Sequence, residues 1–383
     1  MIKSFDLPLD IGNGLNKKIY IKDDLLKQKR DEIDLFLDDE NALKNISFAT
    51  NTLFFNEIQS NNSIEGYHDD IVKINDVVKN FHKLKSKPEE DKKRIMNLFK
   101  SYEYILKEKN INKDTLKKLN DILSNGLITE WDLRKMGDYY REGDVFIFYS
   151  ADASKLPDKG VDPSKVEYYM NKLFSFINTD FNSNSLTDEF IKSQIMHFYF
   201  VYIHPYFDTN GRTARTTSMW YLLNKKAYPY LIFNRGIDLS KNDYYKVIKK
   251  TKENSNITDF ASYMLNSLYS ELEKEHIIQN IKSLNDLNAI DYQTLHYILS
   301  MNGNLSLLDF SSMYNKYNNK KRVKDIDKEM IRPLIDKGIL QFDRKTDKKY
   351  DGINYNYIFD FDSLYKDADS KSDKFFKRKK KEK

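Results

Sequence analysis

The chain contains no cysteine and little glycine or proline: its 383 residues include 12 Gly and 7 Pro. The absence of cysteine excludes disulfide bonds and thiolate metal sites, and it suits a reducing compartment such as the cytoplasm. Few residues therefore break helices, and the apolar residues recur mostly at helical spacing. These features predict a mainly α protein.

Long hydrophobic runs are also missing. No apolar run approaches the roughly 18 residues of a membrane span, and the first residues, MIKSFDLPLDIGNG, lack the apolar core of a signal peptide. We therefore expect a cytoplasmic protein with no membrane partner. The chain is about twice or more the usual length of one domain, which predicts more than one domain.

Basic charge is concentrated at the C-terminus. The net charge is +5, and residues 371–383 hold eight Lys or Arg against two acidic residues, so the rest of the chain sums to −1. Such a run is typical of a solvated end, and we assign 369–383 to a basic disordered tail. Weak contact of this tail with nucleic acid is the alternative interpretation.

Apolar spacing predicts helices along most of the chain, after an irregular start over 1–40 that contains Pro8. Residues 139–149 are β-branched and aromatic, which predicts a short strand or hairpin. One face of the helix at 187–203 should be buried, since its apolar residues are spaced by three and four. The predicted helices are 39–59, 70–84, 89–108, 113–123, 164–178, 187–203, 210–225, 240–252 and 259–273; the buried face comprises Ile191, Ile195, Phe198 and Tyr202.

The pattern changes after about Lys274. Short helices are predicted at 292–301, 308–316 and 327–337, followed by a hairpin formed by 338–342 and 355–360. Three helices and a hairpin are typical of a winged helix, so we predict a winged-helix-like α+β domain over 276–368. A DNA-binding regulator acting through this domain is therefore an alternative function, although the near-neutral body argues against a strong nucleic-acid footprint.

The stretch 204–215, HPYFDTNGRTAR, combines groups suited to handling a nucleotide. His204 precedes Pro205, which disfavours helical angles and predicts that the helix ends there, with the imidazole at a loop mouth. Histidine is the side chain best suited to act as a general base near neutral pH. Asp208 provides the single carboxylate that Mg²⁺ needs when phosphates supply its other ligands. Taken alone, each residue more often caps or packs a helix end.

The second half of this stretch predicts a phosphate site. Thr209, Asn210 and Gly211 lead into a helix, whose first N–H groups attract anions, and Gly211 leaves room for a phosphate to approach. Arg212 and Arg215 lie three residues apart, so both should lie on one helix face, where their guanidinium groups match phosphate oxygens.

This stretch resembles the signature of the Fic family, His-Pro-Phe-x-Asp/Glu-Gly-Asn-Gly-Arg-x-x-Arg. His197, Phe200 and Ile203 fit the helix that leads to the signature, and the resemblance extends over about 40–275. It implies a Fic-type helical bundle with a short β-hairpin flap. We expect an N-terminal helical region at 1–100 and a catalytic core at 101–275.

Two residues depart from the family pattern. Tyr206 replaces Phe, and Thr209 replaces the usual Gly, which places a Cβ beside the expected phosphate and restricts the backbone. Gly211 stands where a phosphotransferase branch of the family has Lys, which favours the branch that transfers AMP.

The resemblance implies a protein adenylyltransferase that uses ATP and Mg²⁺. Asp208 would hold the metal, the segment Thr209–Arg212 would cradle the phosphates, and Arg215 would reach the γ-phosphate. His204 would take the proton from a Ser, Thr or Tyr hydroxyl of an unidentified target protein or of the chain itself. Another nucleotide donor stays open, and so does a homodimer, since some relatives use dimerisation for control.

Two further segments resemble elements of the family. Tyr140-Arg141-x-x-x-Val145-x-Ile147 is similar to the flap that aligns a target peptide through its main chain, and we assign Val145, Phe146, Ile147 and Phe148 to it. The segment 61–66, NNSIEG, resembles the inhibitory motif Ser/Thr-x-x-x-Glu-Gly/Asn, here placed N-terminal to the core as in class II members.

The inhibitory motif implies an ion pair between Glu65 and Arg215 that disturbs the pose of ATP. Gly66 would end the helix that carries Glu65, as a C-cap glycine does. Asn61 replaces the usual Ser or Thr, and its amide can still form hydrogen bonds. Removal of AMP from a modified target, with Glu65 positioning a water, is the alternative reaction for the same residues.

Overall fold

The computed structural model describes residues 1–11, 16–38, 51–80, 89–147, 157–180, 185–279, 287–300, 306–340, 342–344, 349–350, 353–354 and 358–359. Within these ranges the chain is mainly helical, which confirms the predicted class. No helix in the described ranges is long and apolar enough to cross a membrane. The predicted tail, 369–383, lies outside these ranges.

The first strands correct the predicted irregular start. Strands β1 (Ile2–Asp10) and β2 (Asn16–Lys22) pair antiparallel, with a register shift between Ser4 and Pro8. Proline has no N–H to give to the ladder, which accounts for a shift near Pro8. Alternating apolar residues of both strands are buried: Leu7, Leu9, Ile19 and Ile21. A 3-10 turn, η1 (Asp23–Leu26), then leads into α1 (Lys27–Asp38).

Most predicted helices of the next region are present with ends shifted by a few residues. They are α2 (Asn51–Ile64), α3 (Ile71–Lys79), α4 (Glu90–Lys107) and α5 (Lys113–Ser124). The short α6 (Glu130–Leu133) was not predicted. Residues 39–50, predicted as the start of the first of these, lie outside the described residues. Asp70 caps α3 and Asn112 caps α5, each through its side-chain oxygen, as expected at helix starts.

The centre of the molecule is formed by α7 (Pro163–Asn178), α8 (Leu186–Ile203) and α9 (Asn210–Asn224). The predicted face of α8 is buried, and nearly all of its other residues are buried as well. The sequence had predicted burial of one face only. The hairpin β1–β2 covers one end of α8: the Tyr199 hydroxyl donates to the carbonyl of Pro8 over 3.0 Å, and the amide of Asp10 donates to the Tyr202 hydroxyl over 2.8 Å.

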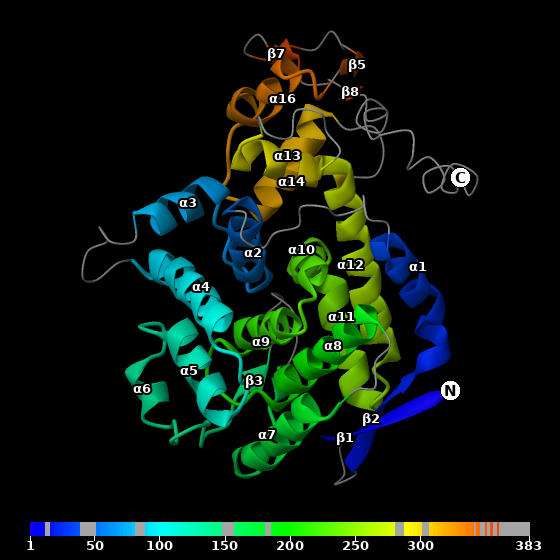
Figure 1. Cartoon of the computed structure of the whole chain (residues 1–383). Helices are drawn as coiled ribbons and strands as arrows, with labels where there is room; N and C mark the ends of the chain where they lie inside the picture. The colour runs from blue at the N-terminus through cyan, green and yellow to red at the C-terminus, as the bar shows by residue number, and fades with distance from the viewer. Residues whose placement is uncertain are drawn as a thin grey trace.

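Helices after α9 enclose this centre and lead toward the C-terminus (Figure 1). They are η3 (Tyr228–Ile232), α10 (Phe233–Leu239), α11 (Lys241–Asn254) and α12 (Thr258–Gln279). The sequence had not predicted η3 and α10. One apolar cluster extends from Leu7 to Leu272, so buried residues of 1–100 and of 101–275 share it.

The C-terminal elements form a second apolar cluster, which extends from Ile278 to Leu340. Its helices are α13 (Ala289–Leu299), α14 (Leu307–Tyr317), α15 (Val323–Ile326), a π-helical turn η5 (Asp327–Ile331) and α16 (Arg332–Asp336). Strand β5 (Phe342–Arg344) pairs antiparallel with β8 (Ile358–Phe359), and β6 (Lys349–Tyr350) pairs with β7 (Ile353–Asn354). The predicted strand at 338–342 therefore begins only at Phe342, and the winged-helix assignment stays a prediction.

Candidate active site

The turn between α8 and α9 presents His204. Helix α8 ends at Ile203, and His204 adopts left-handed backbone angles, φ 53 and ψ 60. The prediction that the helix ends before Pro205 is confirmed, and the backbone of His204 avoids right-handed helical angles as expected. The amide of His204 still donates to the carbonyl of Phe200 over 2.9 Å, which closes the last turn of α8. A left-handed residue at a helix end lets the chain reverse toward α9.

Asn210 holds the loop in shape. Its side-chain oxygen accepts the amide proton of Tyr206 over 2.9 Å, and its side-chain nitrogen donates to the carbonyl of Tyr206 over 2.8 Å. Both amide ends are therefore used within the motif, at a buried position. Asn210 is the first residue of α9, and its side chain organises the loop before that helix.

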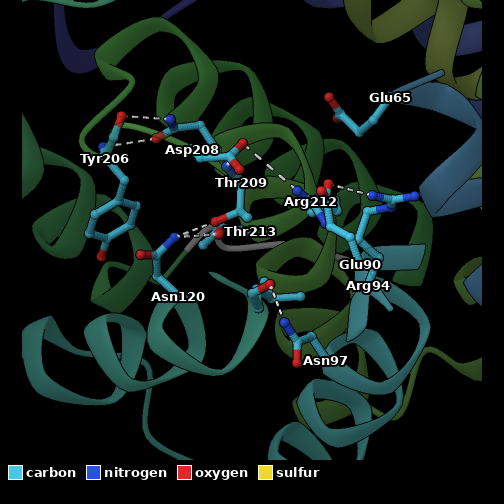
Figure 2. Close-up of polar contacts among 12 residues, drawn as sticks. Glu65, Glu90, Arg94, Asn97, Asn120, Tyr206, Asp208, Thr209, Arg212 and Thr213 are labelled. Atoms are coloured by element: carbon cyan, nitrogen blue, oxygen red, sulfur yellow. Dashed lines mark hydrogen bonds and ion pairs between the residues drawn. The ribbon is translucent and has the colours of Figure 1, made fainter. Parts of the chain in front are cut away.

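Thr209 also has left-handed backbone angles, with φ at 62, and it precedes the first residue of α9. This conformation explains why the family pattern has glycine here, since a Cβ makes the left-handed region costly. Thr209 is stabilised by a contact that glycine lacks. Asn120 of α5 donates from one side-chain nitrogen to the Thr209 hydroxyl over 2.7 Å and to the Thr213 hydroxyl over 3.1 Å, as drawn in Figure 2.

Glu65 follows the end of α2, where Gly66 adopts φ 90, as predicted for a helix-ending glycine. Its carboxylate approaches the start of α9. A Cβ built on Gly211 would lie only 2.2 Å from Glu65 Oε1, so the carboxylate occupies the space beside the glycine backbone. The first turn of a helix favours anions, and here a side-chain carboxylate takes that place.

Arg215 is buried and binds the segment around Glu65, as the resemblance implied. Its Nη2 lies 2.5 Å from Glu65 Oε1, its Nε donates to Asn61 Oδ1 over 2.8 Å, and Nη2 also lies 3.2 Å from the carbonyl of Asn61. Asn61 in turn donates to the Tyr102 hydroxyl over 3.1 Å. The side-chain amide of Asn61 therefore binds Arg215 through its oxygen and the buried Tyr102 through its nitrogen.

The charges of this pair reinforce each other. Burial alone would raise the pKa of Glu65, but Arg215 and Arg212 lower it below its usual value. Burial would lower the pKa of Arg215, and the Glu65 carboxylate raises it instead. Both groups are therefore ionised at neutral pH, and the contact is an ion pair.

Arg212 has free hydrogen-bonding capacity. It is buried, yet its Nε and Nη1 have no hydrogen-bond partner. Its Nη2 lies 3.8 Å from Asp208 Oδ1, and Figure 2 shows Asp208 pointing toward it. Its guanidinium also lies 5.9 Å from the ring centre of Tyr67, and that of Arg94 lies 3.8 Å from the same centre. Buried donors without partners suit an anionic ligand.

Asp208 is half exposed, with 51% of its side chain accessible, and one oxygen accepts the amide proton of Thr209 over 2.6 Å. In the described residues no group of three or more His, Asp or Glu side chains could hold a metal alone.

The hydrogen bonding of His204 defines which ring nitrogen carries the hydrogen. Its Nδ1 lies 3.3 Å from the carbonyl of Val201, and because a carbonyl only accepts, Nδ1 carries the hydrogen. Nε2 then has a free lone pair. Burial lowers the pKa of His204 to about 4, with Arg141 adding to the decrease, while the Val201 carbonyl and Glu65 oppose it. The ring is neutral at pH 7, but its pKa is lower than the ordinary value assumed from the sequence.

The sequence resemblance included Arg141 but did not reveal its contacts. The buried guanidinium donates only to carbonyls: His204 at 2.7 Å, Gly143 at 2.8 Å, Val161 at 2.5 Å and Ile203 at 3.4 Å. Burial lowers its pKa to about 10. Arg141 thus joins the end of α8 to the segments on both sides of the flap. Asn120 and Tyr102 were also missed, because polar residues on amphipathic helices carry no local signal of a distant partner.

The described strands of the flap differ from the predicted hairpin. Strand β3 (Phe146–Ile147) pairs antiparallel with β4 (Asp158–Lys159), which lies beyond the predicted range 139–149. Val145 and Ile147 are buried and Phe146 is exposed, so they alternate as a half-buried strand does. Phe148 lies outside the described residues. His197, which fitted the family helix, is buried, and its Nε2 lies 2.8 Å from the Tyr244 hydroxyl.

Comparison with known families agrees with this geometry. Residues 110–222 match the model of the Fic/DOC family, a range that includes the flap strands, the α8–α9 turn and both arginines. The chain carries a Fic/DOC family domain. Asn61, Glu65 and the helix α2 lie outside the matched range, so the class II-like position of the inhibitory motif is a separate question for this Fic domain protein.

One solved structure agrees with this chain at the level of the fold, and two others match less closely. The chain is similar to a Fic family protein from Desulfovibrio desulfuricans G20, with a TM-score of 0.54 and 19% identity, covering 87% of this chain and 94% of that one. Fic-1 from C. elegans matches with a TM-score of 0.48 and 12% identity over 66% of this chain and 72% of its own. A Fic domain protein from Bacteroides thetaiotaomicron matches at 0.46 and 17% over 70% and 97%.

Proposed function

We propose that the Fic domain transfers AMP from ATP to a Ser, Thr or Tyr hydroxyl of a target protein, and that Glu65 inhibits this reaction. The position of the Glu65 carboxylate carries the proposal. It lies beside Gly211 at the first turn of α9 and binds Arg215, so an internal anion occupies the place where the phosphates of a nucleotide would bind.

The surrounding groups fit a nucleotide with Mg²⁺. Arg212 has two buried nitrogen atoms without hydrogen-bond partners, and these would bind phosphate oxygens. Asp208 is the exposed carboxylate nearest to them in the motif, and it would hold Mg²⁺ together with phosphate oxygens. The ion would neutralise phosphate charge.

The chemical step uses His204. We infer that Nε2 takes the proton of the target hydroxyl while the oxygen bonds to the α-phosphorus of ATP, and that the bond to the β-phosphate oxygen breaks to release pyrophosphate. Negative phosphates near the imidazole would raise its pKa, as Glu65 does in the resting protein. ATP binding would thus bring the pKa of His204 closer to neutral pH.

The strand β3 supplies the means to hold the target. Its exposed Phe146 and its short pairing with β4 leave room for a peptide to add along the flap, and main-chain pairing of this kind carries little side-chain selectivity. The side chain to be modified would then be presented to His204, to which Arg141 ties the base of the flap.

Inhibition follows from competition for Arg215. Replacing the Glu65–Arg215 contact by a phosphate requires breaking a charge-assisted hydrogen bond, which costs on the order of 1.5–3 kcal/mol. That cost corresponds to a suppression of roughly 10- to 150-fold. Glu65→Gly should therefore raise labelling of the chain or of a target by labelled ATP, and Glu65→Gln should raise it less, since an amide still hydrogen-bonds.

The test compares labelling by ATP carrying the label at the α-phosphate. His204→Ala should abolish labelling in the Glu65→Gly background. Glu329→Gln, which breaks an ion pair with Lys321 on the surface, is the control and should leave labelling unchanged. Equal labelling by wild type and Glu65→Gly would refute the inhibition, and labelling that survives His204→Ala would remove His204 as the base.

A second reaction is supported by the same position of Glu65. Its carboxylate is close enough to raise the pKa of His204, so it could position a water beside an AMP group on a modified target. Incubating AMP-modified protein with wild type and with Glu65→Gly separates the reactions. Release of AMP that requires Glu65 supports hydrolysis, whereas labelling that increases without Glu65 supports transfer.

A further inference from the structure

Helix α2, which leads to Glu65, is buried over its described side chains at 55–64 although most of them are polar. Because buried polar groups need hydrogen-bond partners, such a helix requires polar surfaces around it. In Figure 1, α2 lies between the central helices and the C-terminal helices α13 and α14. The buried polar residues of α2 are Asn56, Glu57, Gln59, Ser60, Asn61, Asn62 and Ser63.

The central helices satisfy one side of α2. Asn61 binds Arg215, and Asn234 of α10 donates to Glu57 over 3.0 Å. In addition, the hydroxyl of Tyr245 donates to the carbonyl of Ile64 over 3.2 Å. The last carbonyls of a helix have no partner within the helix, and this bond gives one of them a partner. This side belongs to the site already described.

The C-terminal helices satisfy another side through Gln59. Gln293 of α13 donates to Gln59 Oε1 over 2.5 Å, and Gln59 Nε2 donates to Asn318 Oδ1 over 2.9 Å and to the carbonyl of Asp69 over 2.8 Å. Gln59, Gln293 and Asn318 are all buried. Asn318 is itself held in place, since it donates to the Tyr297 hydroxyl over 3.0 Å.

We propose that Gln59, Gln293 and Asn318 form a positioning cluster through which the C-terminal helices hold Glu65 on Arg215. This inference rests on the proposed inhibitory role of Glu65. None of the three residues touches the α8–α9 turn in the contacts described, so the cluster acts through α2. Gln59 lies within α2, and Glu65 comes six residues later, directly after the helix ends.

The mechanism is a matter of polar satisfaction. While Gln293 and Asn318 are in place, both ends of the Gln59 amide have partners in the buried interface. Without them, Gln59 Oε1 stays buried without a partner unless α2 moves, and Gln59 Nε2 keeps only the carbonyl of Asp69. A buried polar group without a partner is costly. Movement of α2 would withdraw Glu65 from Arg215. The C-terminal helices are thereby part of the inhibitory device, and whatever binds them can alter transfer.

The experiment uses the full-length protein and two asparagines near the end of α14. Asn318→Ala removes the contact with Gln59 together with those to Tyr297 and Tyr314. Asn315→Ala removes contacts with Lys321 only and is the control. With ATP below its KM, Asn318→Ala should raise the initial labelling rate about tenfold, equivalent to about 1.4 kcal/mol. Asn315→Ala should leave it unchanged. The rise should appear as a lower KM for ATP.

Gln293→Ala is the second variant, since its side chain donates to Gln59 and a similar rise is expected. Both variants are then combined with Glu65→Gly, in which no inhibitory contact is left to loosen, so neither should raise the rate further. A rise in the labelling rate that persists in the Glu65→Gly background would overturn the proposal. A loss of labelling in Asn318→Ala or Gln293→Ala alone would also overturn it, since it would indicate general destabilisation. If Glu65→Gly raises labelling but both variants leave it unchanged, only the positioning cluster is refuted. If Glu65→Gly itself has no effect, the inhibition and the cluster fall together.

Discussion

Glu65 and Gly211 share one small volume: a Cβ on Gly211 would lie 2.2 Å from Glu65 Oε1. The two residues are far apart in the sequence. Glu65 directly follows the end of α2, and Gly211 belongs to the first turn of α9. The absence of a side chain at Gly211 therefore leaves space for the Glu65 carboxylate in the resting protein. In the proposed complex it would leave the same space for the phosphates.

This relationship predicts a coupled response to Gly211→Ala. In wild type, the new methyl group displaces the Glu65 carboxylate from Arg215 and should lower the free energy of unfolding by about 1–2 kcal/mol. In the Glu65→Gly background, alanine is the better helix residue and should raise it by about 0.5–1 kcal/mol. Urea denaturation of the four proteins measures the coupling. Equal changes in both backgrounds would mean that the two residues do not compete.

Thr209 should respond differently to alanine and glycine. Thr209→Ala keeps the left-handed backbone but loses the hydrogen bond from Asn120, so it should lower the free energy of unfolding by about 1–2 kcal/mol. Thr209→Gly loses the same bond but relieves the backbone, so it should stay within about 1 kcal/mol of wild type. Thr209→Ser, which keeps the hydroxyl, is the control. Alanine proving as stable as glycine would show that the backbone stores no strain.

The lowered pKa of His204 predicts a pH-dependent stability. The folded pKa is about 4, below the unfolded value of about 6.5, so on acidification the unfolded chain binds the proton first. The contribution of the neutral ring is therefore complete above pH 6.5 and is lost as the pH falls toward 4. Unfolding of His204→Asn should depend less steeply on pH in this window.

The same group can be followed directly by NMR. Glu65 raises the pKa of His204, so Glu65→Gly should lower the imidazole pKa further, while Arg141 and Lys252 continue to depress it. Titration of the ring signals in both proteins checks the sign. A His204 pKa near 6.5 in the wild type would contradict the burial of the ring.

Arg141→Lys tests whether the flap base depends on the planar guanidinium. One ammonium group cannot reproduce the set of donations to His204, Gly143, Val161 and Ile203, so buried carbonyls lose partners. We expect a loss of about 2–3 kcal/mol in the free energy of unfolding. Labelling of a target should fall more than ATP affinity, because Arg141 binds carbonyls at the end of α8 and beside the flap strands. Arg322→Lys, at an exposed ion pair, is the control.

Much of the helical arrangement was predictable from apolar spacing, because amphipathic helices repeat their buried residues locally. The helix at 187–203 and the one at 210–225 were placed within a residue of α8 and α9. The N-terminal strands and α10 were not predicted. Their burial depends on partners far along the chain, as in the contact of Pro8 with Tyr199, and local spacing holds no record of such partners.

The candidate site divides in the same way. A histidine before proline, a lone carboxylate, a glycine and two arginines within twelve residues predict a phosphate-handling turn from the sequence alone, and that role stays a prediction. The spacing also predicts that the two arginines share one face of the helix that follows. The positive φ of Thr209 could be suspected only from the family glycine. The support from Asn120, 89 residues away, could not be foreseen.

The sequence by itself determined that the chain is mainly helical, that a helix ends at His204 and that another begins at Asn210, since these depend on neighbours within a few residues. Only the tertiary structure decided that α2 is buried on its polar side chains, that Arg141 joins the flap to the end of α8, and that the pKa of His204 is lowered to about 4. Burial and long-range hydrogen bonding are properties of the packed chain. Residues that are distant in sequence create them only when they meet.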